Sequence, residues 1–245
     1  MLYLCSVKLK QTTIKLKAFV ALLLLMVAGL QVCIAQVNHP YVDLALPSGT
    51  LWAAYNVGAT SAEQPGTFFA WGETKGKTEY NRSTYQIGGQ LTHGYRNISK
   101  YVTKSEYGKD GITDNLSTLL PEDDAATANW GSDWEMPTLA QIEELCDPNI
   151  TFSRFATLNG VKGRAFTSKI NGNSLFLPGT GTYDALCFCD NNNLGFYWSR
   201  SLNPDMNSHA YGLYIYVLGE CGPLNTWRTD GLVVRPVLKK KQNNP

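Results

Sequence analysis

One clear helix followed by a series of short strands limits the folds that this chain can adopt. Residues 137–146 begin with a proline, place Thr138 and Gln141 at the spacing of a capping box, and carry apolar residues on one helical face. Beyond Asn159 the pattern predicts strands instead, at residues 163–168, 174–178, 195–199, 210–217 and 231–238. Long helical patterns are scarce elsewhere in the 245 residues, so we expect an α+β fold.

The elements expected in the first half are shorter. Acidic residues at the start of 123–130 favour a short helix, because they suit the positive end of the helix dipole. Residues 42–46 and 51–57 predict two strands joined by a turn into a hairpin. The stretch 80–111 is polar, rich in tyrosine and without a period, so we expect a long surface loop there.

The first 35 residues have the pattern of a secretory signal peptide. Lysines precede an uncharged run at 19–30, and Ala35 is a small residue suited to cleavage. The run is shorter than the roughly 20 residues of a stable membrane-spanning helix. An uncleaved anchor stays an alternative, as does a lipidated Cys33, although Val32 before it is larger than the residue that such processing favours.

We therefore expect an exported protein, in the periplasm, at the outer-membrane surface or outside the cell. It would meet a membrane only in the alternative in which its N-terminus stays anchored. Residues 36–245 contain no internal repeat and no Pro- or Ser-rich linker, which predicts a single domain with a core at about 42–238. The 21 basic and 20 acidic residues nearly balance, so no field attracts nucleic acid. The oligomeric state stays open.

Four cysteines follow the signal peptide, at Cys146, Cys187, Cys189 and Cys221. An even number in an oxidising compartment favours disulfides. Cys187 and Cys189 are too close along a strand to pair with each other, so we expect one of them to join Cys221. A four-thiolate zinc site is the alternative, but the C-x-C pair lacks the usual spacer between ligands.

Five segments resemble one family in their order and spacing. They are 42–52, 56–59, 69–74, 124–131 and 231–237, and they span nearly the whole mature chain. They resemble the Fibrobacter succinogenes major paralogous domain, which is common in exported proteins of Bacteroidetes. This resemblance implies a C-type-lectin-like fold, in which two helices pack on a twisted, mostly antiparallel sheet with long loops.

Residues 135–145 are also similar to a helix of formylglycine-generating enzymes, which share that fold. Glu135 and Ile142 stand where the enzymes have Arg and Trp. Those enzymes hold copper with a cysteine pair, and the residues around Cys187 and Cys189 do not match their motif. No G-x-S-x-G elbow accompanies the histidines, so a Ser/His/Asp hydrolase is not indicated either. We expect a protein that is not an enzyme.

Residues 203–205 resemble the calcium-binding loop of true C-type lectins, but no W-N-D follows them. Calcium takes six to eight oxygen ligands, and the sequence does not assemble such a set. We therefore expect no cofactor and no metal, with calcium as the open alternative.

Polar segments near the C-terminus form the expected binding surface. They mix aromatic residues with Asn, Ser, Asp and Arg, which is typical of paratopes, and the resemblance implies that ligands bind at these loops. The expected contact residues are Arg200, Asn203, Asp205, Asn207, His209, Tyr211, Asn225, Trp227 and Arg228. The alternative is that these are only polar loops that join strands.

We expect Trp227 to stack on a sugar or fill a pocket, and Arg228 to pair with a carboxylate or carbonyl. The predicted function is recognition of a glycan or a surface protein, in an adhesive protein or one whose Asn-rich loops are diversified by a retroelement. The alternatives are a formylglycine-generating-enzyme-like oxidase and a structural, fimbria-like surface subunit.

Overall fold

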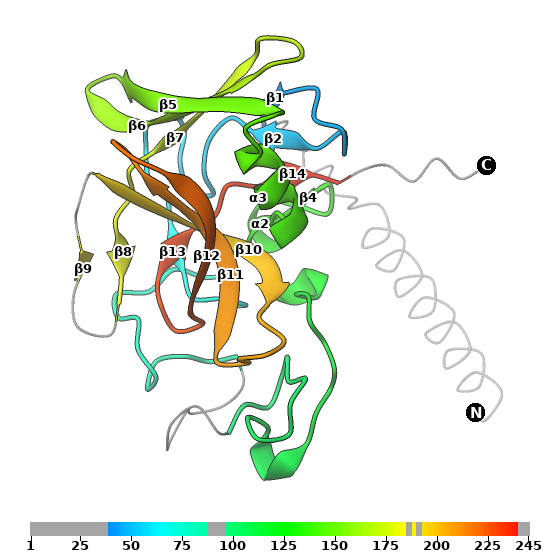
Figure 1. The fold of residues 1–245 in the computed structure, drawn as a ribbon. Helices are drawn as coiled ribbons and strands as arrows, with labels where there is room; N and C mark the ends of the chain where they lie inside the picture. The colour runs from blue at the N-terminus through cyan, green and yellow to red at the C-terminus, as the bar shows by residue number, and fades with distance from the viewer. Residues whose placement is uncertain (1–38, 88–96, 185–187, 190–192, 240–245) are drawn as a thin grey trace, which may run out of the picture. The chain divides into compact units, whose positions relative to one another are not determined.

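A five-stranded sheet organises the structure (Figure 1). The computed structural model describes residues 39–87, 97–184, 188–189 and 193–239, and for 188 and 189 it describes the backbone only. All of these residues belong to one compact unit, Asn38–Pro245. The strands of this sheet are, in spatial order, β12 (Cys221–Trp227), β11 (His209–Tyr216), β10 (Leu194–Leu202), β13 (Leu232–Val233) and β3 (Phe68–Phe69). Neighbours pair antiparallel except β10 and β13, which are parallel.

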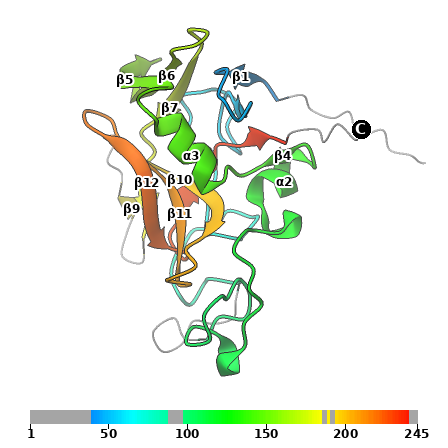
Figure 2. The ribbon, with the colours of Figure 1, turned by 45° about the vertical axis from the view of Figure 1, so that its right-hand side comes forward.

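The α-helix α3 (Leu139–Cys146) covers one face of this sheet (Figure 2). Its buried Ile142 and Leu145 join a core cluster that contains Leu213 and Ile215 of β11. The capping box is present, because Thr138 accepts from the backbone of Gln141 and the Gln141 side chain accepts from the backbone of Thr138. The predicted helix is therefore confirmed, apart from Pro137 and Thr138, which precede its first turn.

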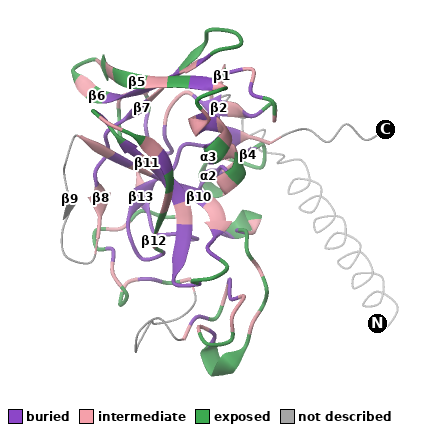
Figure 3. Ribbon diagram, viewed as in Figure 1, coloured by how far each residue is buried: buried purple, intermediate pink, exposed green. Residues whose placement is uncertain are grey.

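The opposite face of the sheet is also buried. Trp198 and Ala210 alternate to that side and join a second cluster with Trp71 and with the small residues of α2 (Ala125–Trp130). The predicted helix at 123–130 exists, but Asp124 is its N-cap and accepts from the backbone of Thr127. Figure 3 accordingly shows buried residues concentrated in β10, β11 and β13.

Shorter sheets and helical turns complete the structure. A four-stranded sheet consists of β1 (Tyr41–Asp43), β2 (Leu51–Ala53), β14 (Val237–Leu238) and β4 (Trp134–Glu135). A three-stranded sheet consists of β5 (Thr151–Leu158), β6 (Val161–Ser168) and β7 (Ser174–Pro178). The remaining elements are the pair β8 (Thr182–Tyr183) and β9 (Phe188–Cys189) and the 3₁₀ turns η1 (Lys109–Gly111) and η2 (Pro121–Asp123). The class is thus α+β, with mostly antiparallel sheets, as predicted.

Several strands differ from the expectation. The hairpin of β1 and β2 exists, but β1 ends early because the Asp43 carboxylate accepts from the Ala45 backbone, which turns into the left-handed region at φ 49°. Residues 231–238 form two separate short strands. The long strands β5 and β12 lie in segments that the sequence pattern did not assign to strands.

The predicted surface loop at 80–111 is wrong in one respect. Turns, one bridge and η1 dominate its described part, and η1 is exposed (Figure 3). Yet Tyr80, Tyr85 and Tyr101 are buried, at 2 %, 3 % and 0 % exposure. The tyrosines turn their rings inward and supply part of the core, so this segment is packed against the sheet rather than lying loosely on the surface.

The strand β12 is an edge of the five-stranded sheet, with β11 as its one neighbour among the described residues. Its register runs from Cys221 opposite Ile215 to Trp227 opposite His209, and exposed Pro223 lies opposite Leu213. Proline is tolerated in an edge strand, because its missing N–H need not pair.

No helix in the described part of the chain has the length and hydrophobicity that crossing a membrane requires.

Candidate functional site

The predicted contact residues separate into buried framework and exposed surface. Arg228 is 1 % exposed, so the expectation that it meets a ligand is wrong. Its guanidinium lies 4.8 Å from the centre of the Trp71 ring and donates to the Tyr85 hydroxyl at 3.0 Å. It also donates to the backbone carbonyls of Lys100, Tyr101 and Asn207. Arg228 therefore ties the segment around 100 to the end of β12.

Asn207 is likewise a framework residue, with 0 % exposure. Its side-chain carbonyl oxygen accepts from the backbone N–H groups of Thr103 and Lys104 at 2.8 and 2.9 Å, and its side-chain amide nitrogen donates to the Thr103 hydroxyl. Because every polar atom of the side chain is used inside the protein, we exclude Asn207 from the contact surface.

Arg200 and Asn203 have mainly internal partners as well. The Arg200 guanidinium pairs with the Glu135 carboxylate and donates to the Leu119 carbonyl. Asn203, 7 % exposed, accepts from the backbone of Asp205 and donates to the Asn225 side chain at 3.1 Å. Asn203 thus holds the turn after β10 beside β12, whereas Arg200 ties β10 to β4 and to the segment before η2.

The remaining predicted residues gather at one end of β11 and β12. Trp227 is 39 % exposed, and its ring centre lies 4.0 Å from that of His209 at an angle of 39°. In the register, Tyr211 faces exposed Asn225, and these two share the side of the strands that carries His209 and Trp227. Asp205 is well exposed nearby in sequence and pairs with Lys104. We call Trp227, His209, Tyr211 and Asn225 the tryptophan patch.

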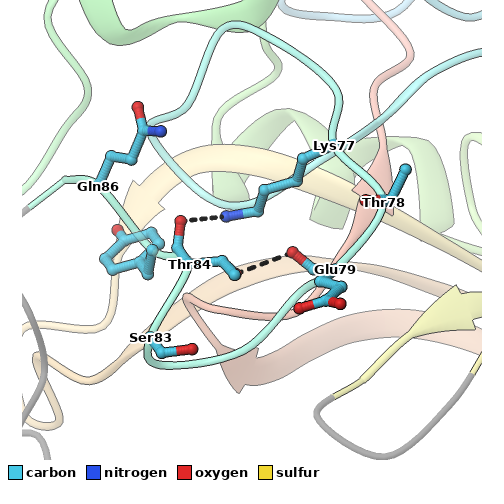
Figure 4. Close-up of a pocket in the computed structure, with 7 residues that line it drawn as sticks. Lys77, Thr78, Glu79, Ser83, Thr84 and Gln86 are labelled. Atoms are coloured by element: carbon cyan, nitrogen blue, oxygen red, sulfur yellow. Dashed lines mark hydrogen bonds between the residues drawn. The ribbon is translucent and has the colours of Figure 1, made fainter.

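The loop of residues 77–86 extends the tryptophan patch, which the sequence did not predict. The Arg82 guanidinium lies 6.0 Å from the centre of the Trp227 ring, a cation–π arrangement. The same loop surrounds an open cavity of about 630 Å³ lined by polar side chains (Figure 4). Its lining residues are Lys77, Thr78, Glu79, Ser83, Thr84, Tyr85 and Gln86.

Lys77 fixes the shape of this cavity. Its ammonium group donates to the Thr84 carbonyl at 3.0 Å (Figure 4). It also pairs with the Glu73 carboxylate at 2.8 Å. Thr84 in turn donates to the Glu79 carbonyl at 2.8 Å, which closes the loop on itself. A second cavity of about 390 Å³ is also lined by Lys77 and reaches Glu122 and Asp123.

Two ionisable groups near the tryptophan patch have shifted pKa values. Burial lowers the pKa of His209, whose ring also contacts the Ser208 hydroxyl at 2.9 Å. Burial is the main cause that raises the pKa of Asp230 to about 6, a hydrogen bond from Thr226 opposes the shift, and nearby Asp184 adds to it. At neutral pH the patch therefore carries an uncharged imidazole, and a buried carboxylate follows Trp227 by three residues.

The expected disulfide partners lie only partly within the described residues. Cys187 and the side chain of Cys189 lie outside them, so their predicted pairing with Cys221 stays a prediction. Cys146 and Cys221 are described as free, half-buried thiols. They lie near each other, because α3 ends at Cys146, β12 begins at Cys221 and these two elements pack together against one core cluster.

Within the described ranges, no three His, Cys, Asp or Glu residues lie close enough together to hold a metal ion. The chain matches no family model, no curated protein and no solved structure.

Proposed function

We propose that this chain is an exported, non-enzymatic recognition module that binds a glycan or a protein through the tryptophan patch and the adjoining 77–86 loop. A C-type-lectin-like architecture, which the family resemblance implies, is part of this proposal. The observation that carries it is an exposed tryptophan ring on a strand, beside an arginine and an open polar cavity.

Pre-organisation of the patch supports binding. Trp227 belongs to β12, and the next residue, Arg228, is anchored in the interior by contacts with four other residues through hydrogen bonds. A ring held in this way loses little conformational entropy when a ligand covers it. Aromatic rings on rigid supports are the residues that dominate binding energy at interfaces.

The chemistry of the surroundings indicates a ligand with both apolar and hydroxyl- or amide-rich surface. The indole ring offers apolar area, while Asn225, Tyr211 and the polar residues that line the 77–86 cavity offer hydrogen bonds. Opposite charges at Lys104 and Asp205 neutralise each other at the rim, so strong electrostatic attraction is not expected. Sugars and polar protein surfaces both meet this description.

The test is binding of the full chain to glycan and protein arrays, followed by titration of any ligand found. Trp227→Ala should weaken binding at least tenfold, in line with loss of a central aromatic anchor. Tyr216→Ala is the matched control, because Tyr216 is similarly exposed, at 45 %, but lies at the opposite end of β11. Equal affinities of the two variants, or no ligand on either array, would contradict the proposal.

A further inference from the structure

A pair of thiols joins the helix layer to the edge of the five-stranded sheet. Cys146 is the last residue of α3 and Cys221 is the first residue of β12, and these two elements pack on each other. Both residues pack against the same core cluster and are half-buried, so small reagents reach them while the backbone around them is fixed. Each of the two thiols shifts the pKa of the other, as expected for sulfurs held close together by the packing of α3 on β12.

Polar groups around the pair prepare one of the two sulfurs for reaction. The Ser153 hydroxyl lies 3.4 Å from the Cys221 sulfur, and Arg164 donates to that hydroxyl at 2.8 Å. Arg164 also donates to the Gly219 and Tyr216 carbonyls, so the guanidinium is held beside the start of β12. A fixed positive charge near a thiol stabilises its thiolate.

The two sulfurs are not equivalent. The hydrogen bond from Cys146, with smaller contributions from Ser153 and Arg164, lowers the pKa of Cys221 to about 6. The same hydrogen bond and burial raise the pKa of Cys146. Cys221 is thus the nucleophile of the pair and Cys146 is the residue that keeps its proton.

We propose that Cys146 and Cys221 form a disulfide by exchange with a small-molecule disulfide or a disulfide of an oxidoreductase. The Cys221 thiolate attacks one sulfur of the donor, forms a mixed disulfide and expels one donor thiolate. Cys146 then releases its proton to solvent and attacks the Cys221 sulfur, which expels the second donor thiolate. The two protein thiols lose two protons and two electrons, and the donor disulfide takes up the two electrons.

This pairing differs from the one expected from sequence spacing, in which Cys187 or Cys189 joins Cys221. It does not depend on the proposed recognition function, because the pair lies at the opposite end of β12 from Trp227. The resulting bond would enclose every strand from β5 to β11 in one covalent loop. Cross-links that close long loops restrict the unfolded chain most.

The test starts from the full chain, reduced and freed of reductant, and then exposed to oxidised glutathione. After the remaining thiols are alkylated, peptide mapping should find a Cys146–Cys221 cross-link, and oxidation should raise Tm by roughly 5–15 °C. The variant Cys187→Ser/Cys189→Ser should form the same cross-link. A predominant cross-link from Cys221 to Cys187 or Cys189, or a Cys146 that stays fully open to alkylation, would overturn the proposal.

Single variants test the order of the steps. Cys146→Ser should accumulate a glutathione adduct on Cys221, because the resolving thiol is gone. Cys221→Ser should form an adduct on Cys146 at least tenfold more slowly, because burial and the higher pKa keep that thiol protonated. Equal rates of adduct formation in the two variants would contradict the assignment of Cys221 as the nucleophile. If a variant fails to fold, peptide mapping of the chain without substitutions still tests the cross-link.

Discussion

The two ends of β12 are held in different ways. At the first end, Cys221 packs on α3 and the main core cluster, and its partners are side chains that point inward. At the last end, Trp227 leaves more than a third of its surface to solvent, while its neighbour Arg228 is buried beneath it. We call the end at Cys221, which packs on the core, the attached end of β12, and the end at Trp227, which is partly exposed, the display end. The display end is rigid because the next residue, Arg228, is held by hydrogen bonds in the interior.

The largest effect should come from removing that anchor. Arg228→Met deletes the charged group and leaves the carbonyls of Lys100, Tyr101 and Asn207 buried without a donor. Each such group costs about 1–3 kcal/mol, so we expect the free energy of unfolding to fall by about 3–5 kcal/mol. Urea denaturation measures this. Arg154→Met, at an exposed site on β5, should change it by less than about 0.5 kcal/mol.

If the two arginine variants are equally stable, the hydrogen bonds of Arg228 do not stabilise the display end. The comparison between the ends of β12 would then lose its basis.

The next effect should appear at the attached end. In the oxidised protein, Cys146→Ser removes the proposed cross-link and should lower the free energy of unfolding by about 2–4 kcal/mol. With excess reductant present, the variant and the unaltered chain should differ by less than about 1 kcal/mol, because serine replaces one half-buried thiol. A difference that is the same with and without reductant would assign the loss to packing instead of the cross-link.

Asp230 makes the display end sensitive to pH. The pKa of Asp230 is raised from 3.8 to about 6, mainly by burial, so the folded protein binds more protons than the unfolded chain between about pH 4 and 6. Stability from this group is therefore present below about pH 4 and lost as pH rises through 6. Asp230→Asn should be more stable than the unaltered chain by about 1–3 kcal/mol at pH 7 and about equal at pH 3.5.

Thermal unfolding of the variant and of the unaltered chain, measured from about pH 3.5 to pH 7, gives the difference in stability between them. Other ionisable groups titrate alike in both proteins, so they do not contribute to this difference. A variant that loses stability at pH 7 would show that the charged carboxylate is needed, for example by the Thr226 hydroxyl that donates to it at 2.6 Å.

The smallest effect on stability is expected at Trp227 itself. Because its ring is partly exposed, Trp227→Ala should lower the free energy of unfolding by about 1–2 kcal/mol, less than Arg228→Met, even though we expect it to weaken binding of the proposed ligand at least tenfold. Circular dichroism during urea denaturation provides the measurement. A loss as large as that of Arg228→Met would reassign Trp227 to the core and remove the contrast between adjacent residues.

Local sequence signals predicted the local elements well. The capping box and the apolar face of α3 involve residues within one or two turns, and both are present as expected. The sequence pattern did not predict the strand β5, although the sequence contains the signal of the turn that joins β5 to β6. Asn159 and Gly160 have φ values of 48° and 84° and join Leu158 to Val161, and an Asn-Gly pair is the strongest short signal of a hairpin.

The site was less predictable because it depends on long-range packing. Gly222 and Pro223 indicate a turn by local rules, yet pairing with β11 makes them part of a strand. Trp227 and Arg228 stand side by side in a polar segment, and only the direction of the backbone sends one outward and the other inward. The contact between Cys146 and Cys221 joins positions far apart in the chain, which spacing rules cannot foresee.

The place of Pro223 has a consequence for how copies of this protein meet one another. An unprotected edge strand offers a row of unpaired amide and carbonyl groups on which a second molecule can add a strand of its own, and fibres grow by repeating that step. In β12 the exposed proline interrupts this row at its middle, where no amide hydrogen is available. The edge that carries the tryptophan patch is thereby a poor template for polymerisation, which argues against a fimbria-like assembly built through this strand.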